Sequence, residues 1–158
     1  MKAISLWQPW ASALFTGLKP DETRSWSLPD CAVGVPVAIH AAKRDTKAER
    51  EFFEDTVSNT SDAGPFRDIG IGWYHDLPRG AVIGTVVFAS PVRMEIQRHV
   101  RSLAQQDWGD YSEGRYAWPL VSYDLFAKPI PCIGRQGFFD WEPTPPAVSG
   151  ECLPVAKG

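Results

Sequence analysis

GLKPDETR, residues 17–24, runs from the end of a predicted helix into a predicted strand. Gly17 is typical of the position just past a helix C-terminus. Side chains on a strand alternate between its two sides, so Glu22 and Arg24 are expected to point the same way. Lys19 belongs to the preceding turn and can reach the mouth of the same cleft. The octet therefore predicts three charged side chains around one opening.

These three charges suit a site that holds an anion or a nucleobase. Arg24 offers a flat, two-pronged donor for a phosphate or a base edge, and Lys19 adds a mobile point charge. Glu22 can orient either cation, accept a proton or bind an exocyclic amine. The alternative is an exposed turn with a surface salt bridge, which would contribute at most about 1 kcal/mol to stability.

The segments around the octet indicate a mixed α+β domain. Pro9 stands near the first turn of a helix that follows an opening strand. Thr46 and Glu49 form a capping-box pattern that predicts the start of a second helix. Strands are expected at residues 2–6, 22–28, 35–41, 81–88, 116–126 and 137–141, with a short helix around residues 93–105. Short strands spaced irregularly around helices predict a small β-barrel of about five to six strands flanked by two or three helices, not a doubly wound sheet.

Residues 58–79 interrupt this pattern with a long stretch rich in Gly, Asp, Asn, Ser and Pro. A loop of this length is more often functional or mobile than average. Phe66, Trp73 and Tyr74 are expected to pin it to the body of the domain. We assign residues 1–142 to one domain and the Pro-rich residues 143–158 to an extended or disordered C-terminal tail.

The composition of the 158-residue chain fits one globular domain with an aromatic core, since it holds seven Trp and eight Phe. The net charge of −3 argues against coating duplex DNA through phosphate contacts alone. Residues 45–76 carry eight Asp and Glu against three Lys and Arg, so much of the acidic charge lies in this segment. A positive cleft elsewhere in the chain is therefore compatible with the negative net charge.

No apolar run approaches the roughly 20 residues that span a bilayer, and no secretory leader is evident. Cys31, Cys132 and Cys152 are an odd, widely spaced set, typical of reduced thiols in a cytoplasmic protein.

Aromatic residues flank the octet in the sequence and could stack on a base, a contact typically worth about 1–3 kcal/mol. Tyr116 and Trp118 lie two apart in a predicted strand and share one side, so they are the better candidates for lining the cleft. Trp10 and Trp26 are more simply explained by packing.

His40 ends the strand that we expect to pair with the strand of the octet, and Lys43 follows it closely. An imidazole that titrates near neutral pH can act as an acid or base in RNA cleavage. The simpler interpretation is a structural histidine at a strand end. No spacing of His, Cys or carboxylates resembles a metal site, and neither a nucleoside triphosphate loop nor a Gly-x-Ser-x-Gly elbow is found, so no cofactor is expected.

Four segments in order resemble the ASCH domain family, which is related to the PUA fold. The hallmark of that family is Gly-x-Lys-x-x-Glu-x-Arg, which Gly17, Lys19, Glu22 and Arg24 match at all four positions. The preceding ISLWQPWA, residues 4–11, is similar to the family's opening strand and helix start and includes Trp7 and Gln8. Residues 80–84, 116–118 and 134–141 are similar to its later half, so the resemblance covers roughly residues 2–142.

The resemblance implies a PUA-like barrel with a cleft built around the motif, and a ligand that is RNA or a nucleotide. Some members resemble amidohydrolases for N4-acetylcytidine, bacterial members are associated with ribonuclease activity, and others are modules of transcriptional coactivators. The amidohydrolases carry a threonine nucleophile three positions after the motif lysine, where this chain has Glu22. A carboxylate cannot replace a hydroxyl in that role, although it could act as a general base on water.

Three functional hypotheses remain open. The first is a module that binds single-stranded RNA or a nucleotide, with metal-independent ribonuclease activity as an extension of it. The second is an amidohydrolase acting on a modified nucleoside, and the third is a non-catalytic module that contacts a partner protein through residues 58–79. The candidate catalytic residues are Lys19, Glu22 and His40; the candidate binding residues are Arg24, Trp7, Gln8, Lys43, Tyr116 and Trp118.

Overall fold

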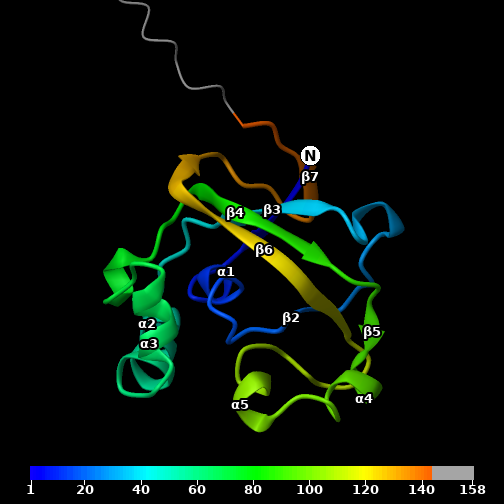
Figure 1. The fold of residues 1–158 in the computed structure, drawn as a ribbon, viewed down its shortest axis with the longest axis horizontal. Helices are drawn as coiled ribbons and strands as arrows, with labels where there is room; N and C mark the ends of the chain where they lie inside the picture. Colours follow the sequence, from blue (N-terminus) through cyan, green and yellow to red (C-terminus); the bar gives the residue numbers. More distant parts are fainter. Residues whose placement is uncertain (144–158) are drawn as a thin grey trace, which may run out of the picture.

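A single curled sheet forms the body of the protein in the computed structural model, which describes residues 1–143 (Figure 1). Its strands follow the order β2-β6-β4-β3-β1-β7, and the short β5 pairs with β6 on the side opposite β2. The bounds of the strands are β1 Lys2–Leu6, β2 Asp21–Arg24, β3 Pro36–Ala41, β4 Ala81–Phe88, β5 Val92–Arg93, β6 Tyr116–Pro131 and β7 Phe138–Asp140.

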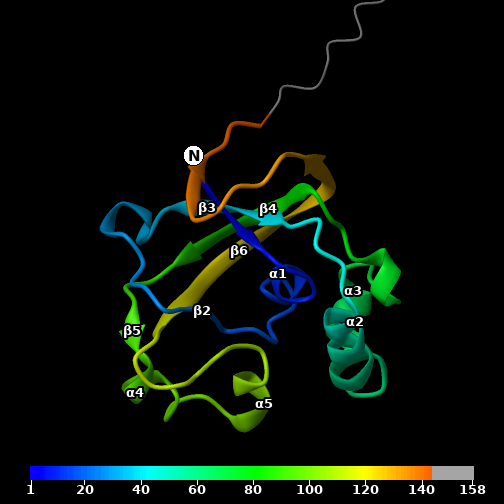
Figure 2. The same ribbon diagram turned by 180° about the vertical axis from the view of Figure 1, so that it is seen from behind.

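The sheet curls because β6 is long enough to pair with different strands along its length. One end of this 16-residue strand pairs with β2 and β5, and the rest pairs with β4. All pairings are antiparallel except that of β1 with β3. The two edge strands, β2 and β7, share no ladder, which leaves a seam in the curled sheet (Figure 2). Side chains close part of this seam, since the rings of Trp26 and Phe138 pack edge to face with centroids 5.8 Å apart.

The largest core cluster fills the inside of the curl. Apolar side chains of β1, β3 and β4 meet there with Leu14 and Phe15, which follow the short helix α1 (Trp10–Ala13). Trp118 of β6 lies at the centre, fully buried between Trp26 and Phe138. The rings of such a cluster contribute large buried areas, and their edge-to-face and stacked arrangements are among those that aromatic pairs prefer.

A second core lies under the helices on one side of the sheet. It packs α2 (Lys47–Phe53), the π-helical turn Glu54–Ser58, α3 (Ala63–Asp68) and the short 3₁₀ helix Tyr74–Asp76 around the buried ring of Trp108. Residues 58–79 are therefore more structured than the expected loop, because Phe66 and Tyr74 anchor them in this core. The prediction for Trp73 is wrong, since 66% of this residue is exposed.

The predicted α+β class with a small barrel-like sheet is confirmed, although residues 1–143 hold seven strands and five short α-helices instead of the expected five to six strands and two or three helices. The helix predicted after Thr46 begins at Lys47, and Glu49 accepts a hydrogen bond from the Thr46 backbone. The single helix expected at 93–105 is two, α4 (Met94–Gln97) and α5 (Leu103–Gln106). Residues 144–158, nearly the whole of the predicted C-terminal tail, lie outside the described part of the chain. Among the described helices, none has the length and apolar character needed to cross a bilayer.

Gly84 lies where β4 changes its register against both of its neighbours. A Cβ at this position would overlap the backbone oxygen of Asp124 and lie 2.6 Å from Cε1 of Phe15. We predict that Gly84→Ala lowers the free energy of unfolding by about 1–3 kcal/mol, because overpacking a close-packed interior forces neighbours to move. Urea unfolding measures the loss, and Gly64→Ala, where nothing lies within 4 Å of the added Cβ, is the control. Equal stability of the two variants would contradict the close packing at Gly84.

Candidate functional site

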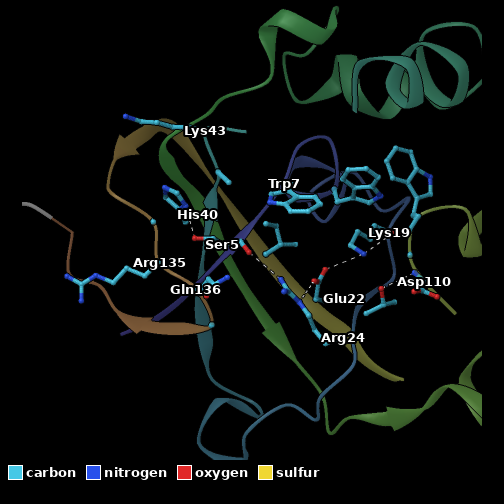
Figure 3. Close-up of a pocket in the computed structure, with 18 of the residues that line it drawn as sticks. Ser5, Trp7, Lys19, Glu22, Arg24, His40, Lys43, Asp110, Arg135 and Gln136 are labelled. Carbon is cyan, nitrogen blue, oxygen red and sulfur yellow. Dashed lines mark hydrogen bonds and ion pairs between the residues drawn. The ribbon is translucent and has the colours of Figure 1, made fainter. Parts of the chain in front are cut away.

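A cavity of about 940 Å³ opens at the seam of the sheet (Figure 3). Its walls come from the ends of β1 and β3, from β2, and from the loops at residues 107–110 and 132–137. The residues with charged or aromatic side chains that line it are Trp7, Trp10, Lys19, Glu22, Arg24, His40, Lys43, Asp107, Trp108, Asp110, Arg115 and Arg135.

The three charges of the octet form one chain across the floor of this cavity. Glu22 accepts a hydrogen bond of 2.8 Å from Nε of Arg24, and its other carboxylate oxygen lies 3.3 Å from Nζ of Lys19. Lys19 also donates to the backbone oxygen of Trp108 at 2.9 Å. Arg24 reaches across the seam and donates from Nη2 to the backbone oxygen of Ser5 at 3.3 Å. The predicted convergence of these side chains is confirmed.

The burial of these charged side chains distinguishes the octet from an exposed turn with a surface ion pair. The side chains of Lys19 and Glu22 are 2% and 7% exposed, whereas that of Arg24 is 27% exposed. Lys19 is thus a fixed part of the floor, and the expectation of a mobile charge at the mouth is wrong. Arg24 donates from Nε to Glu22 and from Nη2 to the backbone of Ser5, and these two hydrogen bonds hold its guanidinium in one orientation. Arg24 is the member that a ligand can contact.

Local sequence explains how the octet places these groups. Gly17 adopts a φ of +82°, which ends the helical region and turns the chain toward β2. In β2, Glu22 pairs with Trp118 and Arg24 pairs with Tyr116 of β6, so both charged side chains project to the same side of the sheet. Asp21 turns the other way and is fully buried.

His40 lies on the opposite side of the cavity from Lys19 (Figure 3). Its Nδ1 is 2.9 Å from Oγ of Ser5, and its Nε2 is 3.0 Å from the backbone oxygen of Cys132. The expectation that the strand of His40 pairs with that of the octet is wrong, because β3 pairs with β1 and β4. His40 therefore enters the site from across the seam, next to Ser5 in the register of β1.

Burial lowers the pKa of His40 below its ordinary value of 6.5, and the nearby charge of Lys43 acts in the same direction, while the hydrogen bond to Cys132 opposes them. The unfolded chain therefore takes up a proton at a higher pH than the folded protein does. The contribution of neutral His40 to stability is fully present above about pH 6.5 and is lost as the pH falls through the lower folded-state pKa.

We accordingly predict that the free energy of unfolding falls between pH 7 and pH 5 more steeply for the wild-type protein than for His40→Gln. Glutamine keeps an N–H donor at this position but takes up no proton in this range. Urea unfolding at a series of pH values provides the measurement, with His75→Gln as the control for an exposed histidine. Parallel profiles for wild type and His40→Gln would refute the assignment.

The remaining predicted residues divide into two groups. Trp7 and Lys43 line the cavity, and Trp7 is 50% exposed. Gln8 and Trp118 are fully buried and do not line the cavity, contrary to the expectation that they belong to the site. Gln8 instead donates to the hydroxyl of Ser12 and the backbone oxygen of Pro78.

Tyr116 lies outside the cavity, where its hydroxyl accepts a hydrogen bond from Arg93 and its ring lies under the guanidinium of the same residue. Tyr116 and Trp118 do share one side of β6, as the spacing indicates. Glu22 and Arg24 of β2 share that side through their register with these two residues, but both rings pack with the largest core cluster instead of lining the cavity.

Several residues of the site were not predicted from the sequence. Ser5 sits on β1, and Asp110 and Arg115 form an ion pair of 3.3 Å at the rim near Lys19. The loop at residues 132–137 supplies Arg135 and Gln136 to the other end. The glycines at 134 and 137 could have indicated that this loop belongs to the site, since glycine is common where the backbone approaches a ligand closely. Among residues 1–143, no group of His, Cys, Asp and Glu is arranged to hold a metal ion.

No family model and no curated protein matches the chain. Solved structures similar to it include the ASCH protein from Zymomonas mobilis, with 19% identity over 82% of this chain and 72% of that chain, and a TM-score of 0.48. Two mutants of the same protein give identities of 19% and 20% and TM-scores of 0.47 and 0.46, again over 82% of this chain and over 74% and 72% of theirs. At this level of likeness, function has to be inferred from the chain's own residues.

Proposed function

We propose that this chain is an ASCH-type protein that binds a nucleotide, or a short single-stranded RNA segment, in the cavity at the seam. The observation that carries the proposal is the buried chain of Lys19, Glu22 and Arg24, which occupies the motif positions of that family. It presents a preoriented guanidinium to the cavity, and such a fork matches the geometry of a phosphate or a base edge.

The charge of the lining supports an anionic ligand. Five Lys and Arg residues line the cavity against three acidic ones, although the whole chain carries a net charge of −3. Lys43 and Arg135 lie on either side of His40 in Figure 3, both on the side opposite Lys19. Neither forms an ion pair with another described residue, so both can attract phosphate groups from the rim.

An exposed indole supplies the surface on which a base can stack. The ring of Trp7 is held by the guanidinium of Arg44, which lies 3.8 Å from its centroid. One face of the indole is thus covered, and the ring is fixed at the cavity edge. Stacking of a base on an aromatic ring typically contributes about 1–3 kcal/mol and tolerates any base, which suits a site without a strict sequence code.

The size and the recessed position of the cavity favour single nucleotides or unpaired strands over a duplex. A volume of about 940 Å³ lies within the range of sites that enclose small ligands. A duplex would instead need an extended basic face, which the charge distribution of this chain does not provide.

Binding is better supported than RNA cleavage by His40 or Glu22 acting directly. His40 has both ring nitrogens engaged, by Ser5 and by the backbone of Cys132. Glu22 has both carboxylate oxygens engaged, one by Lys19 and the other by Arg24. A ribonuclease in which either group acts directly on the RNA would have to displace those partners first.

The test is a titration of labelled single-stranded RNA and of mononucleotides into wild-type protein and Arg24→Ala, followed by fluorescence anisotropy and calorimetry. Loss of one oriented arginine contact typically costs about 1–3 kcal/mol, so we expect Arg24→Ala to bind at least about 10-fold more weakly. Arg98→Ala, which removes a partly exposed arginine outside the cavity, is the matched control. Equal affinities for wild type and Arg24→Ala would overturn the proposal.

A second candidate function rests on the exposed indole of Trp73. It borders a separate hollow of about 750 Å³ whose walls include Arg50, Tyr74 and Arg79. Exposed aromatic and arginine side chains are typical anchors of protein interfaces. If the chain serves a protein partner through residues 58–79, Trp73→Ala should abolish capture of that partner while RNA binding is kept.

A further inference from the structure

Ser5 and His40 form a hydrogen-bonded pair inside the cavity. The parallel register of β1 and β3 places them next to each other, with Oγ of Ser5 2.9 Å from Nδ1 of His40. The neighbours Ile4 and Leu6 point into the core, so alternation along β1 directs the Ser5 side chain to the cavity. His40 is 2% exposed, whereas Ser5 is partly exposed and lines the cavity, so Ser5 is the more accessible residue of the pair.

The hydrogen bonds define the direction of proton transfer within this pair. A carbonyl oxygen can only accept, so Nε2 of His40 must carry the proton that it donates to Cys132. Nδ1 of the neutral ring is then an acceptor, and the Ser5 hydroxyl donates to it. A nucleophile that donates to a base, with that base oriented by a third group, is the arrangement that activates a serine.

Gly134 packs closely against the pair, where only a residue without a side chain fits. A Cβ at this position would overlap Cε1 of His40 and lie 2.7 Å from Oγ of Ser5. Any larger residue would cover the hydroxyl or push the imidazole aside. The loop at residues 132–137 thus orients His40 through the carbonyl of Cys132 and packs against the pair without a side chain, while Ser5 still lines the cavity.

We propose that Ser5 is a nucleophile and His40 its general base, and that together they transfer the acyl group of a small ester or amide. Oγ of Ser5 forms a bond to the carbonyl carbon while its proton passes to Nδ1 of His40. The bond to the leaving oxygen or nitrogen then breaks, and that atom takes the proton from His40. Water adds to the resulting acyl-serine in the same way, releasing a carboxylic acid and restoring the serine.

Arg24 is placed to stabilise the negative charge that develops on the carbonyl oxygen. Its Nη2 already donates to the backbone oxygen of Ser5, so the guanidinium lies beside the attacking residue. Fixed donors aimed at a developing oxyanion are typically a large part of the rate enhancement of such reactions. Together with Lys43 and Arg135 at the rim, it favours a substrate that also carries an anionic group. This activity does not depend on nucleotide binding and can hold if that proposal fails.

An alkyl fluorophosphonate tests the pair without knowledge of the substrate. Attack by Oγ on phosphorus expels fluoride, and the hydroxyl proton leaves through His40. Intact-mass spectrometry follows the rate of labelling, and peptide mapping finds the modified residue. We expect one label on Ser5 of the wild-type protein, none on Ser5→Ala, and an unchanged rate for Ser112→Ala, which removes an exposed hydroxyl.

The role of His40 is tested by His40→Gln and by Gly134→Ala. General-base catalysis typically contributes about 100-fold or more, so His40→Gln should label at least about 100-fold more slowly. Gly134→Ala keeps both members of the pair but displaces the imidazole of His40, so it should also slow labelling. No label on wild-type Ser5, a label elsewhere, or a rate that neither variant changes would each overturn the proposal.

Discussion

Replacing Asp21 by alanine should lower the free energy of unfolding by about 3 kcal/mol or more. The carboxylate is fully buried behind β2 and accepts a hydrogen bond from Gln97, two from Arg101 and one of 2.6 Å from the hydroxyl of Tyr111. Removing one partner of a buried charged network leaves the others unpaired, which costs more than the net contribution of the pair. Burial also raises the pKa of Tyr111, so its hydroxyl stays a donor across the ordinary pH range.

Urea unfolding followed by tryptophan fluorescence measures the effect on Asp21→Ala. The control is Asp140→Ala, which removes an exposed carboxylate paired with Lys2 and should leave the midpoint nearly unchanged. Similar midpoints for the two variants would show that the Asp21 network does not hold α4 and the following loop against β2.

Replacing Lys19 by methionine should lower the free energy of unfolding by a similar amount, about 3 kcal/mol. Methionine fills a similar volume, so the loss comes from the charge and not from a cavity. Without the ammonium, the buried carboxylate of Glu22 keeps Arg24 alone as its charged partner, and the backbone oxygen of Trp108 loses its donor.

The double variant Lys19→Met/Glu22→Gln separates the charge effect from packing. Neutralising both partners removes the uncompensated buried charge, so the double variant should be more stable than Lys19→Met alone. Lys47→Met, which removes an exposed lysine, is the control for the charge change. A double variant that loses the sum of both single losses would contradict the coupling of Lys19 with Glu22.

The central geometry of the site was predictable because it lies within eight consecutive residues. Strand alternation places Glu22 and Arg24 together, and Lys19 follows from the turn. What alternation does not give is which side chains on a shared side are buried in the core and which line the cavity. For this reason the spacing of Tyr116 and Trp118 correctly predicted a shared side of β6 but not that Trp118 is buried in the core.

The opposite wall of the cavity was not predictable, because it depends on contacts far apart in the chain. Ser5 meets His40 through the parallel pairing of β1 with β3, and the sequence pattern does not specify which strands pair. The loop at residues 132–137 reaches His40 across 92 positions of sequence. Similarly, residues 58–79 read as a loop from their composition, although Phe66 and Tyr74 fold them onto the second core.

Photo-crosslinking tests most directly whether the cavity binds single-stranded RNA. Oligonucleotides that contain 4-thiouridine would be irradiated with the wild-type protein, and the crosslinked peptides mapped by mass spectrometry. We predict crosslinks at Trp7 and in residues 132–137, lost when unlabelled RNA competes and reduced in Arg24→Ala. Crosslinks confined to the outer face of β6 or to residues 58–79, with none in the cavity, would contradict the account.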